Sequence, residues 1–183
     1  MTNIIDAQRQ VQQNLPWNFS VNLVDIAFIT LGLSLVSRET IMPLLVGQLT
    51  DSKIVIGLIP AVYGLGFYLP QLLTANYTER LKRKKPYVML LGGLGERVPY
   101  LLMGLVVLYF TVDTPQVTLL LFFLLLTLTA LTNGLATPAW FTLIGKVLPV
   151  NRRGIFFGVS AGLSRVSLRG LATLSASLVN NAW

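Results

Sequence analysis

Long apolar runs, separated by short polar gaps, follow one another along this chain. Each run reaches about 20 residues, which is the length that a helix needs to cross the hydrocarbon core of a bilayer. The runs cover approximately residues 21–46, 54–74, 87–109, 117–141 and 155–179. The pattern predicts an all-α integral membrane protein, a bundle of about five transmembrane helices that follows a polar N-terminal tail at residues 1–16.

Lysine and arginine are concentrated in the gaps that lie on one side of the predicted membrane. These residues are Arg80, Lys82, Arg83, Lys84 and Lys85 after the second run, Lys146, Arg152 and Arg153 after the fourth, and Arg9 in the tail. The gaps on the opposite side contain only Lys53. Cytoplasmic loops carry the excess of positive charge in membrane proteins. We therefore expect a multi-pass protein of the plasma (inner) membrane, with its N-terminus and both basic loops in the cytoplasm.

The composition agrees with a membrane protein and excludes most other classes. Apolar residues make up 54% of the chain and charged residues 11%, whereas soluble domains carry roughly 25% charged residues. The chain has no Cys and no His, so thiol chemistry, most zinc sites and the commonest general base are absent. We expect no enzyme activity, no catalytic residue, no metal and no cofactor. The net charge of +7 does not indicate nucleic-acid binding, because the basic residues lie in the gaps; the expected partner is the lipid bilayer.

Two pairs of charged residues interrupt the apolar runs at membrane depth: Arg38 with Glu39, and Glu96 with Arg97. Each charge costs about 2.5–3.5 kcal/mol at the middle of a bilayer on insertion scales. Sequence neighbours point about 100° apart on a helix, so each residue is expected to find its partner on another helix or in water. Two hypotheses stay open. The four residues form a structural ion pair between helices, or they line a cavity that receives a solute or a coupling ion.

Small residues at a spacing of four mark the faces on which membrane helices pack closely. Such residues are Ala130, Gly134 and Pro138 in the fourth run, and Gly57, Ala61 and Gly64 in the second. We expect these two faces to pack within the bundle.

The gap between the second and third runs contains the motif Ala75-x-x-x-Glu79-Arg80-x-Lys82-Arg83-Lys84. It resembles the motif G-x-x-x-D-[RK]-x-G-[RK]-[RK] of the major facilitator superfamily, in spacing and in its place between helices 2 and 3. Both glycines are replaced here, and Glu stands in place of Asp. A second likeness follows the fourth run, where Leu148-Pro149 precedes Arg152-Arg153-Gly154, as in the family's loop after helix 4. The chain resembles the family over about residues 17–164.

The resemblance implies a secondary transporter that moves a small solute by alternating access. Family members consist of two six-helix halves with the solute bound between them. This chain then corresponds to the N-terminal part, and a C-terminal half is an implied partner. An ion or solute gradient would drive transport.

The resemblance also implies roles for the two basic loops. Residues Ala75, Glu79, Arg80, Lys82, Arg83 and Lys84 would act as a cytoplasmic latch, in which Glu79 pairs with the opposite half. Arg152, Arg153 and Gly154 would form the second cytoplasmic loop.

The fifth run is the least similar to the family, because Arg165 and Arg169 lie one turn apart within it. Three explanations stay open: a fragment of a longer transporter, a frameshifted product, and a half-length protein that works with another half. Two alternatives to transport also stay open, namely a non-transporting membrane scaffold or assembly protein of the same fold and an inactive truncated product.

Overall fold

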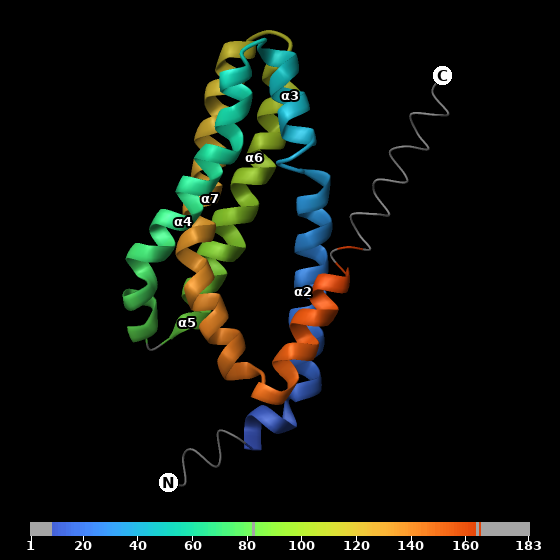
Figure 1. Ribbon diagram of the computed structural model, residues 1–183, viewed down its shortest axis with the longest axis vertical. Helices are drawn as coiled ribbons and strands as arrows, with labels where there is room; N and C mark the ends of the chain where they lie inside the picture. Colours follow the sequence, from blue (N-terminus) through green and yellow to red (C-terminus); the bar gives the residue numbers. More distant parts are fainter. Residues whose placement is uncertain (1–8, 82, 164, 166–183) are drawn as a thin grey trace, which may run out of the picture. The chain divides into compact units, whose positions relative to one another are not determined.

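The computed structural model describes residues 9–81, 83–163 and 165, and every regular element in these ranges is a helix (Figure 1). The chain divides into two units. One comprises residues 1–37 and 144–183, and the other comprises residues 38–143.

The first unit contains α2 (Leu15–Leu35), the last residues of α7 (Pro115–Val147) and a helical segment at 150–163. Aromatic packing holds its two ends together. The rings of Phe19 and Phe156 meet edge to face with centroids 5.5 Å apart, and Phe156 is fully buried. Residues 9–13, within the polar tail, are helical.

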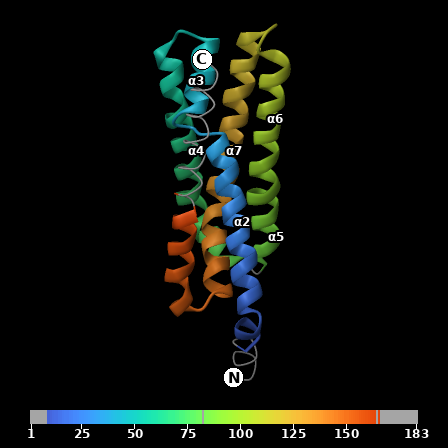
Figure 2. The same ribbon diagram turned by 90° about the vertical axis from the view of Figure 1, so that its right-hand side faces the viewer.

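The second unit contains the remaining helices. They are α3 (Ile41–Leu49), α4 (Lys53–Arg80), α5 (Lys84–Val88), the wide π-helical turn η1 (Met89–Leu94), α6 (Gly95–Phe110) and most of α7. Figures 1 and 2 show α7 between α4 and α6. The short connection from Thr50 to Ser52 reverses the chain between α3 and α4.

Four helical stretches are long and apolar enough to cross a membrane: Leu15–Leu35, Lys53–Arg80, Lys84–Phe110 and Pro115–Val147. They fit a multi-pass membrane protein. The second, third and fourth runs of the sequence fall within the last three of these stretches. The fifth expected span, 155–179, lies mostly outside the described residues; those that are described there, 155–163 and 165, are helical.

The first expected span, 21–46, is wrong as a single helix. Helix α2 ends at Leu35, residues 36–40 are not helical, and α3 begins at Ile41. The interruption coincides with the polar sequence from Ser37 to Thr40. Two adjacent charges and two hydroxyl side chains favour local hydrogen bonds over a continuous apolar helix. The break therefore places Arg38 and Glu39 in a turn and not on a helix face.

The line of small residues in α7 packs against α4, as expected for Ala130 and Gly134. Both residues are buried. A Cβ added at Gly134 would overlap the carbonyl oxygen of Phe67, and one added at Gly66 would lie 2.8 Å from the Cβ of Ala130. The partner on α4 is thus Gly66. It is not the expected face, because a Cβ at Gly57 or Gly64 would meet nothing within 4 Å.

Helix α6 packs against the opposite side of α7 through a similarly close approach. A Cβ at Gly95 would lie 3.0 Å from the Cβ and Cγ2 of Thr132. The hydroxyl of Thr132 donates to the Gly95 carbonyl at 2.7 Å. Through Gly66 and Gly95, α4 and α6 thus both pack closely against α7.

Candidate functional site

A cluster of polar side chains joins α4, α6, α7 and the break before α3. The amide nitrogen of Asn133 lies 2.7 Å from a carboxylate oxygen of Glu96 and 3.5 Å from the hydroxyl of Tyr63. The guanidinium of Arg38 lies over the ring of Tyr63, with its central carbon 3.7 Å from the ring centroid. One continuous chain of contacts therefore leads from Arg38 through Tyr63 and Asn133 to Glu96. These four residues are called the polar cluster below.

The polar cluster lies near the middle of the membrane-spanning helices. Tyr63 is ten residues beyond the start of α4, which corresponds to about 15 Å at a rise of 1.5 Å per residue. Glu96 stands near the centre of the stretch Lys84–Phe110, and Asn133 near the centre of α7. A hydrocarbon core about 30 Å thick would place all three close to its midplane.

Each helix presents its cluster residue for a local reason. Asn133 is held by its own helix, because Thr137 donates its hydroxyl to both the carbonyl oxygen (2.7 Å) and the side-chain oxygen (3.2 Å) of Asn133. The side-chain oxygen is thereby occupied, and the amide nitrogen is directed outward as a donor. Glu96 follows Gly95, where α6 lies so close to α7 that an added Cβ would be 3.0 Å from Thr132. This proximity brings the carboxylate within reach of Asn133.

The structure brings together two of the four charged residues singled out in the sequence. Arg38 and Glu96 belong to the polar cluster and are partly buried. Glu39 and Arg97 are exposed, as follows for Arg97 from its rotation of about 100° away from Glu96 on the helix.

Sequence reasoning missed Tyr63 and Asn133 as site residues. Asn133 carries a usable signal, since an amide inside an apolar run must find a partner within the protein. Tyr63 carries a weaker one, because tyrosine is amphipathic and occurs on many membrane helices. Only the packing of α4 against α7 brings its hydroxyl to the cluster.

The motif between the second and third spans occupies the end of α4 and the start of α5. Glu79, Arg80 and Arg83 are exposed, whereas Lys84 is only 6% exposed. Ala75 accepts a hydrogen bond of 2.9 Å from the hydroxyl of buried Thr78. Lys82 lies outside the described residues. The motif is thus an interhelical turn whose charged side chains are mostly accessible.

In the second basic loop, Arg152 and Arg153 differ sharply. Arg153 donates from Nε to the carbonyl of Leu148 at 3.0 Å and from its terminal nitrogen to the carbonyl of Gly145. Carbonyls at the C-terminus of a helix have no intrahelical donor, and a cation there also complements the helix dipole. Arg153 therefore caps α7, while Arg152 and Gly154 are exposed. Arg165 is exposed, and Arg169 lies outside the described residues.

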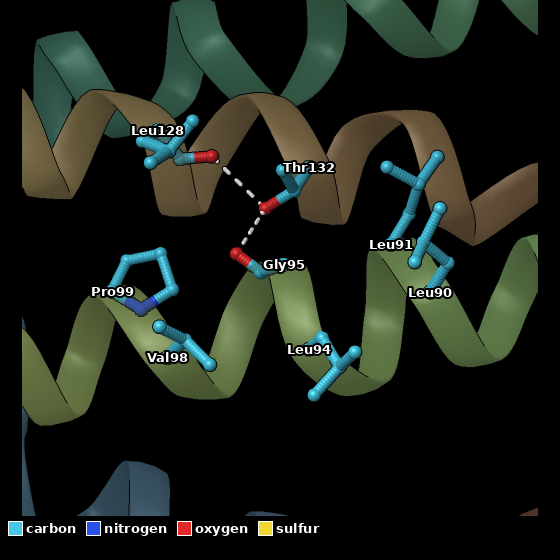
Figure 3. Close-up of a pocket in the computed structure, with 8 residues that line it drawn as sticks. All are labelled: Leu90, Leu91, Leu94, Gly95, Val98, Pro99, Leu128 and Thr132. Carbon is cyan, nitrogen blue, oxygen red and sulfur yellow. Dashed lines mark hydrogen bonds between the residues drawn. The ribbon is translucent and has the colours of Figure 1, made fainter.

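A separate apolar cavity of about 350 Å³ opens between η1–α6 and α7 (Figure 3). Its lining comprises Leu90, Leu91, Leu94, Gly95, Val98, Pro99, Leu128 and Thr132. The hydroxyl of Thr132 points toward the carbonyls of Gly95 and Leu128, at 2.7 and 2.9 Å. The polar atoms of the lining are engaged with one another, so the cavity offers little to recognise a polar solute. Within the described residues, no group of three or more Asp and Glu side chains could hold a metal ion.

No family model, curated protein or solved structure matches this chain. The likeness to a transporter family rests on the two loop motifs and on the order of the apolar runs.

Proposed function

We propose that this chain is the N-terminal part of a secondary transporter of the major facilitator type, which moves a small solute by alternating access. The polar cluster carries the proposal. Charged and amide side chains near the middle of a membrane protein are costly, and they mark solute or ion pathways by default. The polar cluster would form this half's share of the solute site, next to an implied C-terminal half. A gradient of an ion or of a second solute would drive the transport.

The broken helix between α2 and α3 supports the same function. Non-helical backbone at membrane depth is tolerated where it is buried in protein or lines a water-filled cavity. Interrupted helices at the midplane are a recurrent feature of transporter binding sites. Arg38 lies within such an interruption and contacts Tyr63 of α4.

Under this proposal the turn between α4 and α5 acts as a latch. Glu79 would pair with the opposite half in the outward-open state, and Arg80 and Arg83 would support it. Their exposure leaves them accessible to such a partner. The same proposal places the protein in the plasma (inner) membrane with this turn in the cytoplasm.

The test asks whether the polar cluster is hydrated. The chain contains no Cys, so a Tyr63→Cys variant carries a single thiol at the cluster. In native membranes, a membrane-impermeant thiol reagent should modify this thiol. Leu69→Cys is the matched control, since Leu69 lies on the same helix with a 54% exposed, apolar side chain that would face lipid. The control should remain unmodified.

Two outcomes separate transport from the scaffold alternative. Modification of Tyr63→Cys but not of Leu69→Cys supports a hydrated pathway. If neither variant reacts, the cluster is a dry structural network and the transport proposal fails.

The latch is tested in the same system. Adding Glu79→Gln should increase the reactivity of Tyr63→Cys from the cytoplasmic side, whereas adding Asp113→Asn, at the other end of the helices, should not.

A further inference from the structure

Tyr100 lies on the same face of α6 as Glu96, because the two residues are four positions apart. Its hydroxyl is buried and has no hydrogen-bond partner among residues 9–81, 83–163 and 165. Buried hydroxyl groups are nearly always hydrogen-bonded, so each exception needs an explanation. The surroundings of Tyr100 supply one.

Tyr100 lies near three members of the polar cluster. Arg38, Tyr63 and Glu96 all lie within electrostatic range of it. The guanidinium of Arg38 contacts Tyr63, with its central carbon 3.7 Å from the ring centroid. A guanidinium carries five N–H donors, so Arg38 can donate to the oxygens of a further group besides its contact with Tyr63. Two kinds of donor, a guanidinium edge and a phenol, thus occur in one partly buried region of the second unit.

The charges around these donors restrict what can bind. A cationic solute would be repelled by Arg38, and a dianion such as phosphate would be repelled by Glu96. Glu96 accepts a hydrogen bond from Asn133, and a carboxylate can accept bonds from several donors at once. A solute with one carboxylate and a nearby N–H or O–H donor would match both charges.

We propose that the polar cluster, together with Tyr100, binds a small monocarboxylate that also carries a hydrogen-bond donor, as amino acids and hydroxy acids do. The carboxylate contacts Arg38 and the hydroxyl of Tyr100, and the donor group contacts the carboxylate of Glu96. This inference rests on the proposed function for its purpose, but binding is measurable without transport.

The experiment uses the full chain, purified and embedded in lipid nanodiscs, with affinity measured by calorimetric titration. Four probes separate the chemical requirements: L-alanine and L-lactate carry both groups, propionate lacks the donor, and glycerol lacks the carboxylate. L-alanine or L-lactate should bind, propionate should bind more weakly, and glycerol should not bind. Inorganic phosphate, as a fifth probe, should not bind.

Two tyrosine variants then identify the donor. Tyr100→Phe should weaken the affinity for the best probe roughly tenfold, as expected for the loss of one hydrogen bond to a charged group. In the absence of ligand, Tyr100→Phe should be at least as heat-stable as the unmodified protein, because the hydroxyl that it removes has no partner within the described part of the chain. Tyr109→Phe is the matched control: Tyr109 is 68% exposed on the same helix, so its change should leave the affinity unaltered. Arg38→Lys, which keeps the charge but loses the planar edge, should also weaken binding.

Several results would overturn the inference. These are tighter binding of glycerol or phosphate than of the carboxylates, equal affinity of Tyr100→Phe and the unmodified protein, and a loss of heat stability in Tyr100→Phe that accounts for its weaker binding. Failure of all five probes would also overturn it. If Tyr63→Cys remains reactive in that case, the transport proposal stands with a different solute; if it is unreactive as well, both proposals fail.

Discussion

Pro99 leaves the carbonyl of Gly95 without its helical donor, and a side chain of another helix replaces that donor. In a regular α-helix the carbonyl of residue 95 accepts from the backbone N–H of residue 99, which proline lacks. The hydroxyl of Thr132 on α7 donates to this carbonyl at 2.7 Å (Figure 3). The proline in α6 thus creates a specific point of attachment to α7, one residue away from the contact between Asn133 and Glu96.

We predict that the effect of Thr132→Val depends on Pro99. Valine keeps the shape of threonine and removes the hydroxyl, so the variant should lower the free energy of unfolding by about 0.6–1.7 kcal/mol, the range for hydrogen bonds between membrane helices. In a Pro99→Ala background the backbone N–H returns, and the same substitution should cost close to nothing. Denaturant unfolding in detergent micelles measures the free energy of unfolding of the unmodified protein, the two single variants and the double variant. Thr127→Val is the control, because the hydroxyl of Thr127 donates to the Phe123 carbonyl of its own helix. Equal costs of Thr132→Val in both backgrounds would refute the explanation.

The crossing of α7 over α4 should not accept a side chain at Gly134. Because the added Cβ of Gly134→Ala would overlap the backbone carbonyl of Phe67, which cannot rotate away, we expect a loss of about 1–3 kcal/mol of stability. Gly104→Ala offers a matched comparison, with nothing within 4 Å of the added Cβ. Alanine favours the helix by up to about 1 kcal/mol over glycine, so this control should be neutral or stabilising. Thermal unfolding of the two purified variants decides the matter, and a more stable Gly134→Ala protein would show that the crossing is looser than described.

The two neighbouring arginines of the second basic loop should behave differently. Arg153→Gln removes the donor to the carbonyls of Gly145 and Leu148 and should cost about 1 kcal/mol. Faster hydrogen exchange of amides near residue 148 should accompany this loss. Arg152→Gln removes the same charge from an exposed position and should leave exchange unchanged. Similar exchange in both variants would mean that Arg153 does not cap α7.

Membrane orientation can be measured with single cysteines at opposite ends of the spans. Arg83 and Asp113 are both exposed, in the turn after α4 and in the turn after α6. The distribution of basic residues predicts a cytoplasmic location for Arg83. In intact cells an impermeant maleimide should label Asp113→Cys, while Arg83→Cys should react only after the membrane is permeabilised. The opposite labelling pattern would invert the topology and place the proposed latch outside the cell.

The sequence predicts the positions of three membrane-spanning helices, which depend on the thickness of the bilayer. It does not predict which residues of different helices contact each other. Three apolar runs coincide with long helices, because a helix must span a fixed hydrocarbon thickness. The contact face of α7 was also predicted, since small residues are required there. Its partner Gly66 was not, because a line of small residues specifies which face packs and not what packs against it. Gly57 and Gly64 satisfy the same pattern on the same helix and make no such contact.

The charged residues show the same division. Their burial cost marked Arg38, Glu39, Glu96 and Arg97 as residues in need of partners, and the structure places Arg38 beside Tyr63 and Glu96 beside Asn133. The partners Tyr63 and Asn133 are uncharged and were overlooked, because no local pattern distinguishes a tyrosine beside a polar cluster from one at a membrane interface. The break at residues 36–40 was missed for a related reason. Average hydropathy conceals a four-residue polar segment within a long apolar run.

The wide turn η1 affects the direction of every side chain that follows it in α6. A π-helical turn accommodates one residue more than an α-helical turn, and one residue corresponds to a rotation of about 100°. The turn at Met89–Leu94 therefore rotates the side chains that follow it in the third span, relative to their directions in an uninterrupted α-helix. Deletion of one residue within it would convert the turn to a regular one and redirect Glu96 and Tyr100 together, away from Asn133 and Arg38. An insertion or deletion of a single codon in this segment would thus alter the polar cluster more than most substitutions of its members.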